Sequence, residues 1–142
     1  MENTDLSVEE IVKLAVAAGR SAAERAPMDA FKATERRLYA LPILREKLER
    51  DRERLSTLDG TNRADLEADI AADADEVQTM ESALAKCAGD AYYQTVTGRY
   101  FEGLDDAKIG KLLHCDVSTV WRNRKRLIQR ISVYLYGAFA VR

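Results

Sequence analysis

Apolar residues recur at helical spacing along most of the chain, and short polar or glycine-containing segments separate the helices that this spacing predicts. The pattern predicts an N-terminal helix in residues 1–27, two long helices in residues 28–88 and several shorter helices in residues 89–142. With only two prolines and much Ala, Leu, Glu and Arg, the composition is typical of helices rather than strands. We therefore predict an all-α fold with three segments at these boundaries.

The first predicted helix has a clear beginning and end. Ser7-Val8-Glu9-Glu10 forms a capping box, in which the serine hydroxyl and a later glutamate satisfy the free amides of a helix start. The helix should end before Pro27, because the residue before a proline avoids the helical conformation.

Residues 28–88 are expected to form a long helical hairpin. Residues 28–58 carry leucines among alternating charges, and Pro42 should either kink this helix or restart it. A turn is predicted at Asp59-Gly60-Thr61-Asn62, followed by a helix over residues 65–86. The apolar residues of that second helix lie near heptad spacing: Leu66, Ile70, Val77, Met80 and Leu84.

The charges of the two predicted arms are opposite in sign. Residues 28–58 hold eight Lys and Arg against six Asp and Glu, whereas the second arm is strongly acidic. This favours antiparallel pairing within the chain. A narrow leucine stripe suits coiled-coil pairing in a homodimer equally well, and a solvated hairpin without a partner is a third interpretation.

Residues 91–102 predict another helix, closed by Gly103. Its apolar residues are mostly aromatic: Tyr92, Tyr93, Val96, Tyr100 and Phe101. Their helical spacing favours a place in the core over a surface on which nucleic-acid bases stack.

Residues 104–126, LDDAKIGKLLHCDVSTVWRNRKR, predict two short helices joined by a tight corner. Asp105 and Asp116 are placed to cap the two helices. Gly110 suits a close helix crossing, and His114 is expected in a left-handed backbone conformation where similar corners carry glycine. We expect Cys115 to be buried in the corner as a small apolar residue.

The second of these helices has two unlike sides. Val120, Leu127 and Ile131 lie on one side, and Val117 and Arg124 lie near it, with the Arg124 head group extended outward. The opposite side has the composition of a major-groove surface, where base contacts select the sequence and phosphate contacts add affinity. The residues predicted to contact DNA are Val117, Ser118, Thr119, Trp121, Arg122, Lys125 and Arg126.

The roles of these residues differ. Arg122 suits a bidentate contact to guanine, and Thr119 and Lys125 suit phosphates. Trp121 could meet a thymine methyl or a sugar edge, or it could pack against another helix.

Charge is unevenly distributed. The chain has a formal net charge of −2, but residues 99–142 hold nine Lys and Arg against four Asp and Glu, a net charge of +5. The remaining residues, 1–98, carry a net charge of −7. This asymmetry predicts a local nucleic-acid surface, with a solvated helix face as the alternative.

Several other classes of protein are disfavoured. The chain has one histidine, two cysteines without zinc-ligand spacing and no phosphate-binding glycine loop. We therefore expect neither an enzyme nor a metal or cofactor site. The cysteines are expected to be reduced. The acidic first residues do not resemble a signal peptide, and no apolar run approaches a membrane span, so we expect a cytoplasmic protein without membrane contact.

Two stretches resemble known families. The segment YYQTVTGRYFEGLDDAKIGKLLHCDVSTVWRNRKRLIQRI resembles region 4 of bacterial sigma factors and its phage relatives. TERRLYALPILREKLERDRERL resembles the arm of phage late-gene transcription regulators of the ArpU and RinA type. Together the resemblances cover roughly residues 33–135.

The resemblance implies a sequence-specific DNA-binding transcription regulator, a phage or prophage late-gene activator with a C-terminal helix-turn-helix. Its partners would be double-stranded DNA and, through the arm, RNA polymerase or another protein. Two alternatives stay open. One is a small terminase subunit for phage DNA packaging, and the other is a protein–protein interaction module that does not bind DNA.

Overall fold

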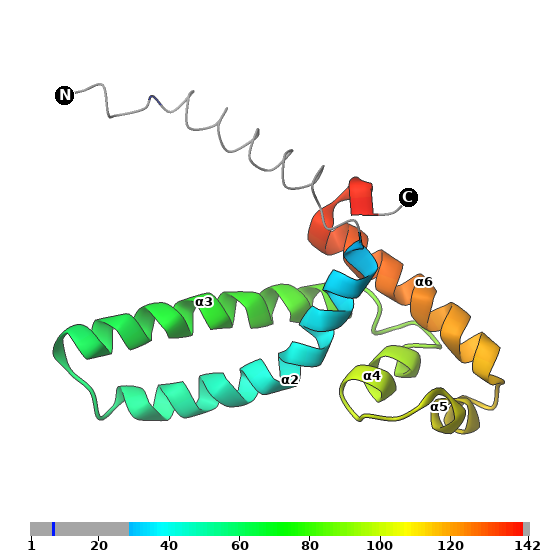
Figure 1. Cartoon of the computed structure of the whole chain (residues 1–142), viewed down its shortest axis with the longest axis horizontal. Helices are drawn as coiled ribbons and strands as arrows, with labels where there is room; N and C mark the ends of the chain where they lie inside the picture. Colours follow the sequence, from blue (N-terminus) through cyan, green and yellow to red (C-terminus); the bar gives the residue numbers. More distant parts are fainter. Residues whose placement is uncertain (1–6, 8–28, 141–142) are drawn as a thin grey trace.

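The structure is a computed structural model that describes residues 7 and 29–140. All the regular elements of that part are helices, which confirms the all-α prediction (Figure 1). They are α2 (Ala30–Leu55), α3 (Gly60–Ala85), α4 (Gln94–Tyr100), α5 (Asp106–Leu113), α6 (Val117–Tyr136) and the 3-10 turn η2 (Ala138–Ala140). The helix predicted in residues 1–27 and its capping box lie outside the described residues, apart from Ser7.

Helices α2 and α3 lie side by side and run in opposite directions (Figure 1). The predicted position of the turn between them is wrong, because α3 begins at Gly60 rather than near residue 65. Gly60 has φ +65°, which lets the chain turn directly into the helix. Arg63 then donates to the Leu55 carbonyl at 2.5 Å, so the end of α2 and the beginning of α3 are tied across the connection.

Pro42 lies inside α2, and the helix continues through it with a change of direction (Figure 1). Proline has no N–H to donate, and its ring crowds the preceding turn, so the kink and not the restart is observed. Before the kink, Thr34 Oγ1 lies 2.7 Å from Ser132 Oγ of α6. After it, Lys47 Nζ reaches Asp73 of α3 at 2.5 Å. The bend therefore lets one helix contact two partners.

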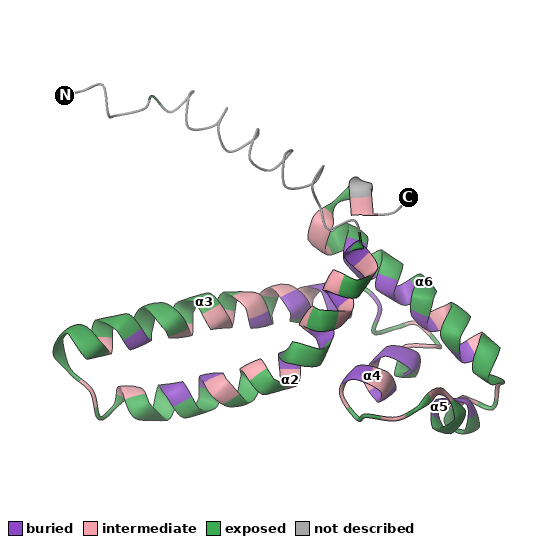
Figure 2. Ribbon diagram, in the orientation of Figure 1, coloured by how far each residue is buried: buried purple, intermediate pink, exposed green. Residues whose placement is uncertain are grey.

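One apolar core joins α2, α3, α4 and α6. Figure 2 shows buried positions gathered where α2, α3 and α6 converge and along α4, with exposed positions prevailing towards the connection between α2 and α3. The core crosses the boundary predicted at residues 88 and 89. Its members are Leu38, Leu41, Leu48, Val77, Met80, Ala83, Leu84, Cys87, Val96, Tyr100, Leu127, Ile128 and Ile131.

Helix α4 is shorter than the predicted helix over residues 91–102. Asp90 accepts a hydrogen bond from the Tyr92 N–H at 2.9 Å, and this local turn delays the helix start. Gly103 has φ +67°, but its prediction as the helix cap is wrong by two residues, because α4 ends at Tyr100 and Phe101 is its C-cap. Tyr100 is buried and donates to Glu35 at 2.6 Å, while the neighbouring aromatics pack on the core, so the prediction of core aromatics is confirmed.

Among residues 29–140, no helix has both the length and the apolar character needed to cross a membrane.

Candidate nucleic-acid interface

Aspartates cap both α5 and α6, as predicted. The Asp105 carboxylate accepts from the Lys108 N–H at 2.9 Å, and the Asp116 carboxylate accepts from the Thr119 N–H at 2.7 Å. These bonds satisfy amides that have no partner inside the helix. The hydrogen bonds from Thr119, with a further one from Ser118, hold the pKa of Asp116 below its usual value.

The corner between α5 and α6 has the predicted left-handed residue. His114 has φ 57° and ψ 44°, and its N–H donates to the Gly110 carbonyl, as does that of Cys115 at 2.9 Å. Histidine occupies this conformation at some energetic cost, and glycine would occupy it freely. His114 thus ends α5 through its backbone, and its imidazole is exposed.

Gly110 is where α5 and the corner approach most closely. A Cβ atom there would lie 2.6 Å from the Cys115 carbonyl oxygen and 3.6 Å from Val120 Cγ2. The predicted need for a small residue is confirmed, with the corner backbone as the nearest neighbour. The Cys115 prediction needs correction, because the residue is only half-buried and its backbone rather than its thiol meets Gly110.

Arg124 differs most from its prediction. Its side chain is 6% exposed, and its guanidinium donates to both Asp106 oxygens, at 2.5 and 3.1 Å. The prediction that the Arg124 guanidinium extends outward into water is therefore wrong. The Asp106 carboxylate binds it within the fold instead. The pair ties α6 to the first turn of α5, and the hydrogen bonds from Arg124 lower the pKa of Asp106.

The sequence carries a signal for this ion pair. Asp105 and Asp106 are adjacent, and only one of them is needed as the cap. Arg124 lies on the apolar side of the next helix, where its guanidinium needs a carboxylate as partner. Asp106 is available for this role because Asp105 already caps α5.

The outer side of α6 carries most of the predicted DNA-contacting residues. Ser118, Trp121, Arg122 and Lys125 are exposed there, and Thr119 is half-buried. Val117 is 50% exposed, so its predicted place near the core side is wrong. It is the first residue of α6 and lies beside the open corner, where little of the chain covers it.

The cationic groups on this side have weak or indirect contacts. Arg122 reaches the Ser118 carbonyl and the Thr119 hydroxyl only at 3.4 Å each, so its guanidinium can turn to a new partner. Lys125 Nζ lies 5.0 Å from the centre of the Trp121 ring, within cation–π range. Lys125 and Trp121 thus form one amphipathic unit.

Arg126, unlike Arg122, is held by strong contacts within the chain. It donates to both oxygens of Asp90, at 2.9 and 3.0 Å, and to Asn123 at 3.1 Å. Asp90 is thereby held ionised, with its pKa lowered by the hydrogen bonds from Arg126. Arg126 lies on the same helix as the other candidates, but the Asp90 carboxylate compensates its charge. Neither Asp90 nor Asn123 had been predicted to matter here.

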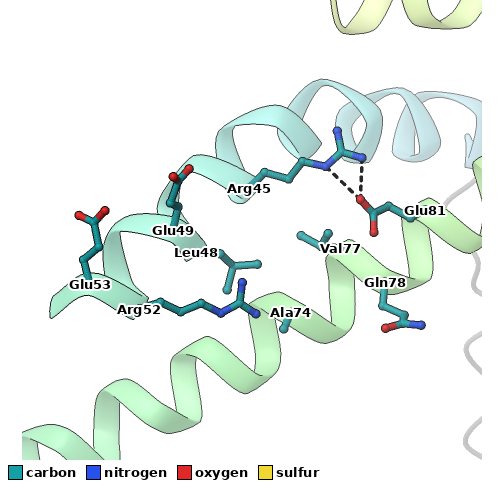
Figure 3. A pocket seen from close by; sticks show the side chains of 9 residues that line it. All are labelled: Arg45, Leu48, Glu49, Arg52, Glu53, Ala74, Val77, Gln78 and Glu81. Carbon is teal, nitrogen blue, oxygen red and sulfur yellow. Dashed lines mark hydrogen bonds and ion pairs between the residues drawn. The ribbon is translucent and has the colours of Figure 1, made fainter. Parts of the chain in front are cut away.

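The described residues contain no group of His, Cys, Asp and Glu that could hold a metal ion. An open groove of about 750 Å³ runs between α2 and α3, with Leu48 and Val77 between the helices and the Arg45–Glu81 ion pair across them (Figure 3). Its charges are of both signs, so it selects no ligand class. Both cysteines are free thiols.

Comparisons of the chain with protein-family models, curated proteins and solved structures find no match.

Proposed function

We propose that the chain is a sequence-specific DNA-binding transcription regulator whose α5 and α6 act as a helix-turn-helix. The supporting observation is the division of α6 into a buried side and an exposed side. Val120, Leu127 and Ile131 are buried, whereas Ser118, Trp121 and Arg122 project outward from its first half. The N-terminal part of a recognition helix is the part that reaches base edges in the major groove.

The exposed groups suit distinct roles in that groove. Arg122 offers a planar fork of donors that matches O6 and N7 of guanine. Lys125 and the Thr119 hydroxyl suit phosphates, as does the positive end of the α6 dipole. The two aspartate caps, Gly110 and the Arg124–Asp106 pair keep α6 at one angle to α5. Rigid presentation lowers the entropy lost on binding.

Helices α2 and α3 form the arm of this regulator as a helical hairpin. In this proposal the arm contacts RNA polymerase or a second copy of the chain. The sequence resemblance to sigma region 4 and to ArpU- and RinA-type regulators supports late-gene activation in a phage or prophage.

The first test is selection of preferred duplexes from a random library by the full chain, followed by fluorescence anisotropy against salt. We expect a steep loss of affinity with salt, because each neutralised phosphate releases a counterion. Arg122→Ala with Lys125→Ala should weaken binding at least tenfold, since loss of one bidentate base contact alone costs about 1–3 kcal/mol.

The matched control replaces two exposed arginines of the arm, Arg50→Ala with Arg52→Ala. This control removes the same amount of positive charge and should leave affinity nearly unchanged. Failure of the full chain to bind any duplex at low salt, or equal loss in both double variants, would overturn the proposal.

A second test places the protein in its host. Chromatin immunoprecipitation with sequencing should give a strong site upstream of late phage genes. Sites at a packaging origin, together with a large ring in light scattering, would instead identify a small terminase subunit.

A further inference from the structure

Two large apolar side chains are exposed at the beginning of α6. Val117 is 50% exposed and Trp121 is 47% exposed. They are four residues apart, so they are neighbours on the helix surface. A single exposed apolar residue is ordinary, and an adjacent pair on the side that carries Arg122 forms a small apolar surface open to a partner.

The exposed side of α6 consists of two parallel rows. The apolar row runs from Val117 to Trp121 and ends at Lys125, whose ammonium lies over the indole ring. The polar row beside it runs from Ser118 to Arg122. Because the residues within each row are four apart, both rows follow the helix axis closely.

The major groove offers one apolar group, the C5 methyl of thymine; its other base-edge groups are hydrogen-bond donors and acceptors. The groove is about 12 Å wide and admits a helix with its side chains, so both rows reach base edges together. Arg122 beside the apolar pair and Lys125 at its end favour a polyanion over an apolar protein surface as the occupant. Resting on the proposed function, we propose that Val117 and Trp121 contact thymine methyl groups adjacent to the guanine contacted by Arg122.

This assignment gives Lys125 a positioning role beside its phosphate contact. Its ammonium lies over one face of the Trp121 ring and restricts the side-chain rotamers of the indole. The preferred duplex should therefore combine thymine and guanine within the few base pairs spanned by the first two turns of α6.

The test replaces each thymine of the selected duplex, one at a time, by deoxyuridine, which removes only the methyl group. At one or two positions the wild-type chain should lose affinity roughly fourfold, the ratio given by one buried methyl of about 0.8 kcal/mol. Val117→Ala and Trp121→Ala should each bind the thymine and deoxyuridine forms of one such position equally. Thermal melting of both variants checks that they fold, as expected for exposed residues.

Arg122→Ala is the matched comparison: it should lose affinity for both duplexes by the same factor and keep the thymine preference. Binding without any thymine-to-deoxyuridine difference would overturn this inference and leave the DNA-binding proposal intact. A thymine preference that persists at the same position in both Val117→Ala and Trp121→Ala would also overturn it. Absence of all duplex binding would overturn the proposed function and this inference together.

Discussion

The antiparallel helices α2 and α3 and the pair of α5 and α6 use the same kinds of contact in opposite surroundings. Between α2 and α3, Arg45 and Glu81 form an ion pair with side chains 43% and 52% exposed. Between α5 and α6, Arg124 and Asp106 form one with side chains 6% and 18% exposed. An ion pair in water contributes little, whereas loss of one partner of a buried pair leaves a charge without compensation.

The starts of α6 and α3 differ in the same way. Asp116 accepts a cap bond at α6, while Asp59 occupies the cap position of α3 without accepting one. Helix α2 is capped by Asp29, which accepts from the Lys32 N–H at 2.9 Å. The contacts at Arg124–Asp106 and Asp116 are therefore buried or specific, whereas their counterparts at Arg45–Glu81 and Asp59 are exposed or absent, and the buried charge of α2 is Asp51 beside Lys47. This comparison predicts unequal sensitivity to single substitutions.

The largest effect is expected from Asp106→Ala. It leaves the buried Arg124 guanidinium without its carboxylate and should lower the free energy of unfolding by about 3 kcal/mol. Glu81→Ala, which breaks the exposed ion pair between α2 and α3, should cost less than about 1 kcal/mol. Urea denaturation measures both. Adding Arg124→Met to Asp106→Ala should restore much of the loss, and equal losses from the two single variants would contradict the comparison.

The same pair should make stability depend on acid. Since the Arg124 guanidinium lowers the pKa of Asp106 in the folded state, the unfolded state binds the proton more readily. The stabilisation is present above the unfolded pKa of about 3.9 and is lost as pH falls through the lower folded value. Asp106→Asn should have a shallower decline of melting temperature between about pH 5 and pH 2. An unchanged decline would show that Asp106 is not the group responsible.

Gly110→Ala should lower the free energy of unfolding by about 2 kcal/mol, because its Cβ would meet a backbone oxygen that cannot rotate away. Gly89→Ala is the matched control, since a Cβ there meets nothing within 4 Å. Circular dichroism melting of the two variants should separate them clearly. A mild Gly110→Ala effect would mean that the corner can open.

Loss of a cap should have a smaller effect. Asp116→Ala removes the acceptor for the Thr119 N–H and should lower the melting temperature measurably, though less than Gly110→Ala does. Asp59→Ala removes a side chain that makes no cap bond, and should leave the melting temperature almost unchanged. Similar losses would indicate that Asp59 also caps α3 in solution.

The smallest effect is expected at His114. Glycine adopts the left-handed conformation without the Cβ penalty, but it also gains freedom in the unfolded chain. His114→Gly should therefore be neutral or stabilising by up to about 1 kcal/mol. A large fall in melting temperature would show that the imidazole itself holds the corner.

The sequence was sufficient for features whose partners lie within a few residues. The caps at Asp105 and Asp116 and the left-handed His114 each depend on local backbone geometry, and all three were predicted correctly. The start of α3 was missed, because Arg63 reaches back to the end of α2 and stabilises a tighter connection than the turn residues suggested.

Only the tertiary structure decided which charges are buried and which stay available. Arg124 and Asp106 are 18 positions apart, and Arg126 and Asp90 are 36 apart. Helical spacing fixes the side of α6 on which a residue lies. It was sufficient to predict that Ser118, Arg122 and Lys125 are exposed. It does not say which carboxylate another part of the chain brings to that side, because this depends on how α4, α5 and α6 pack against one another.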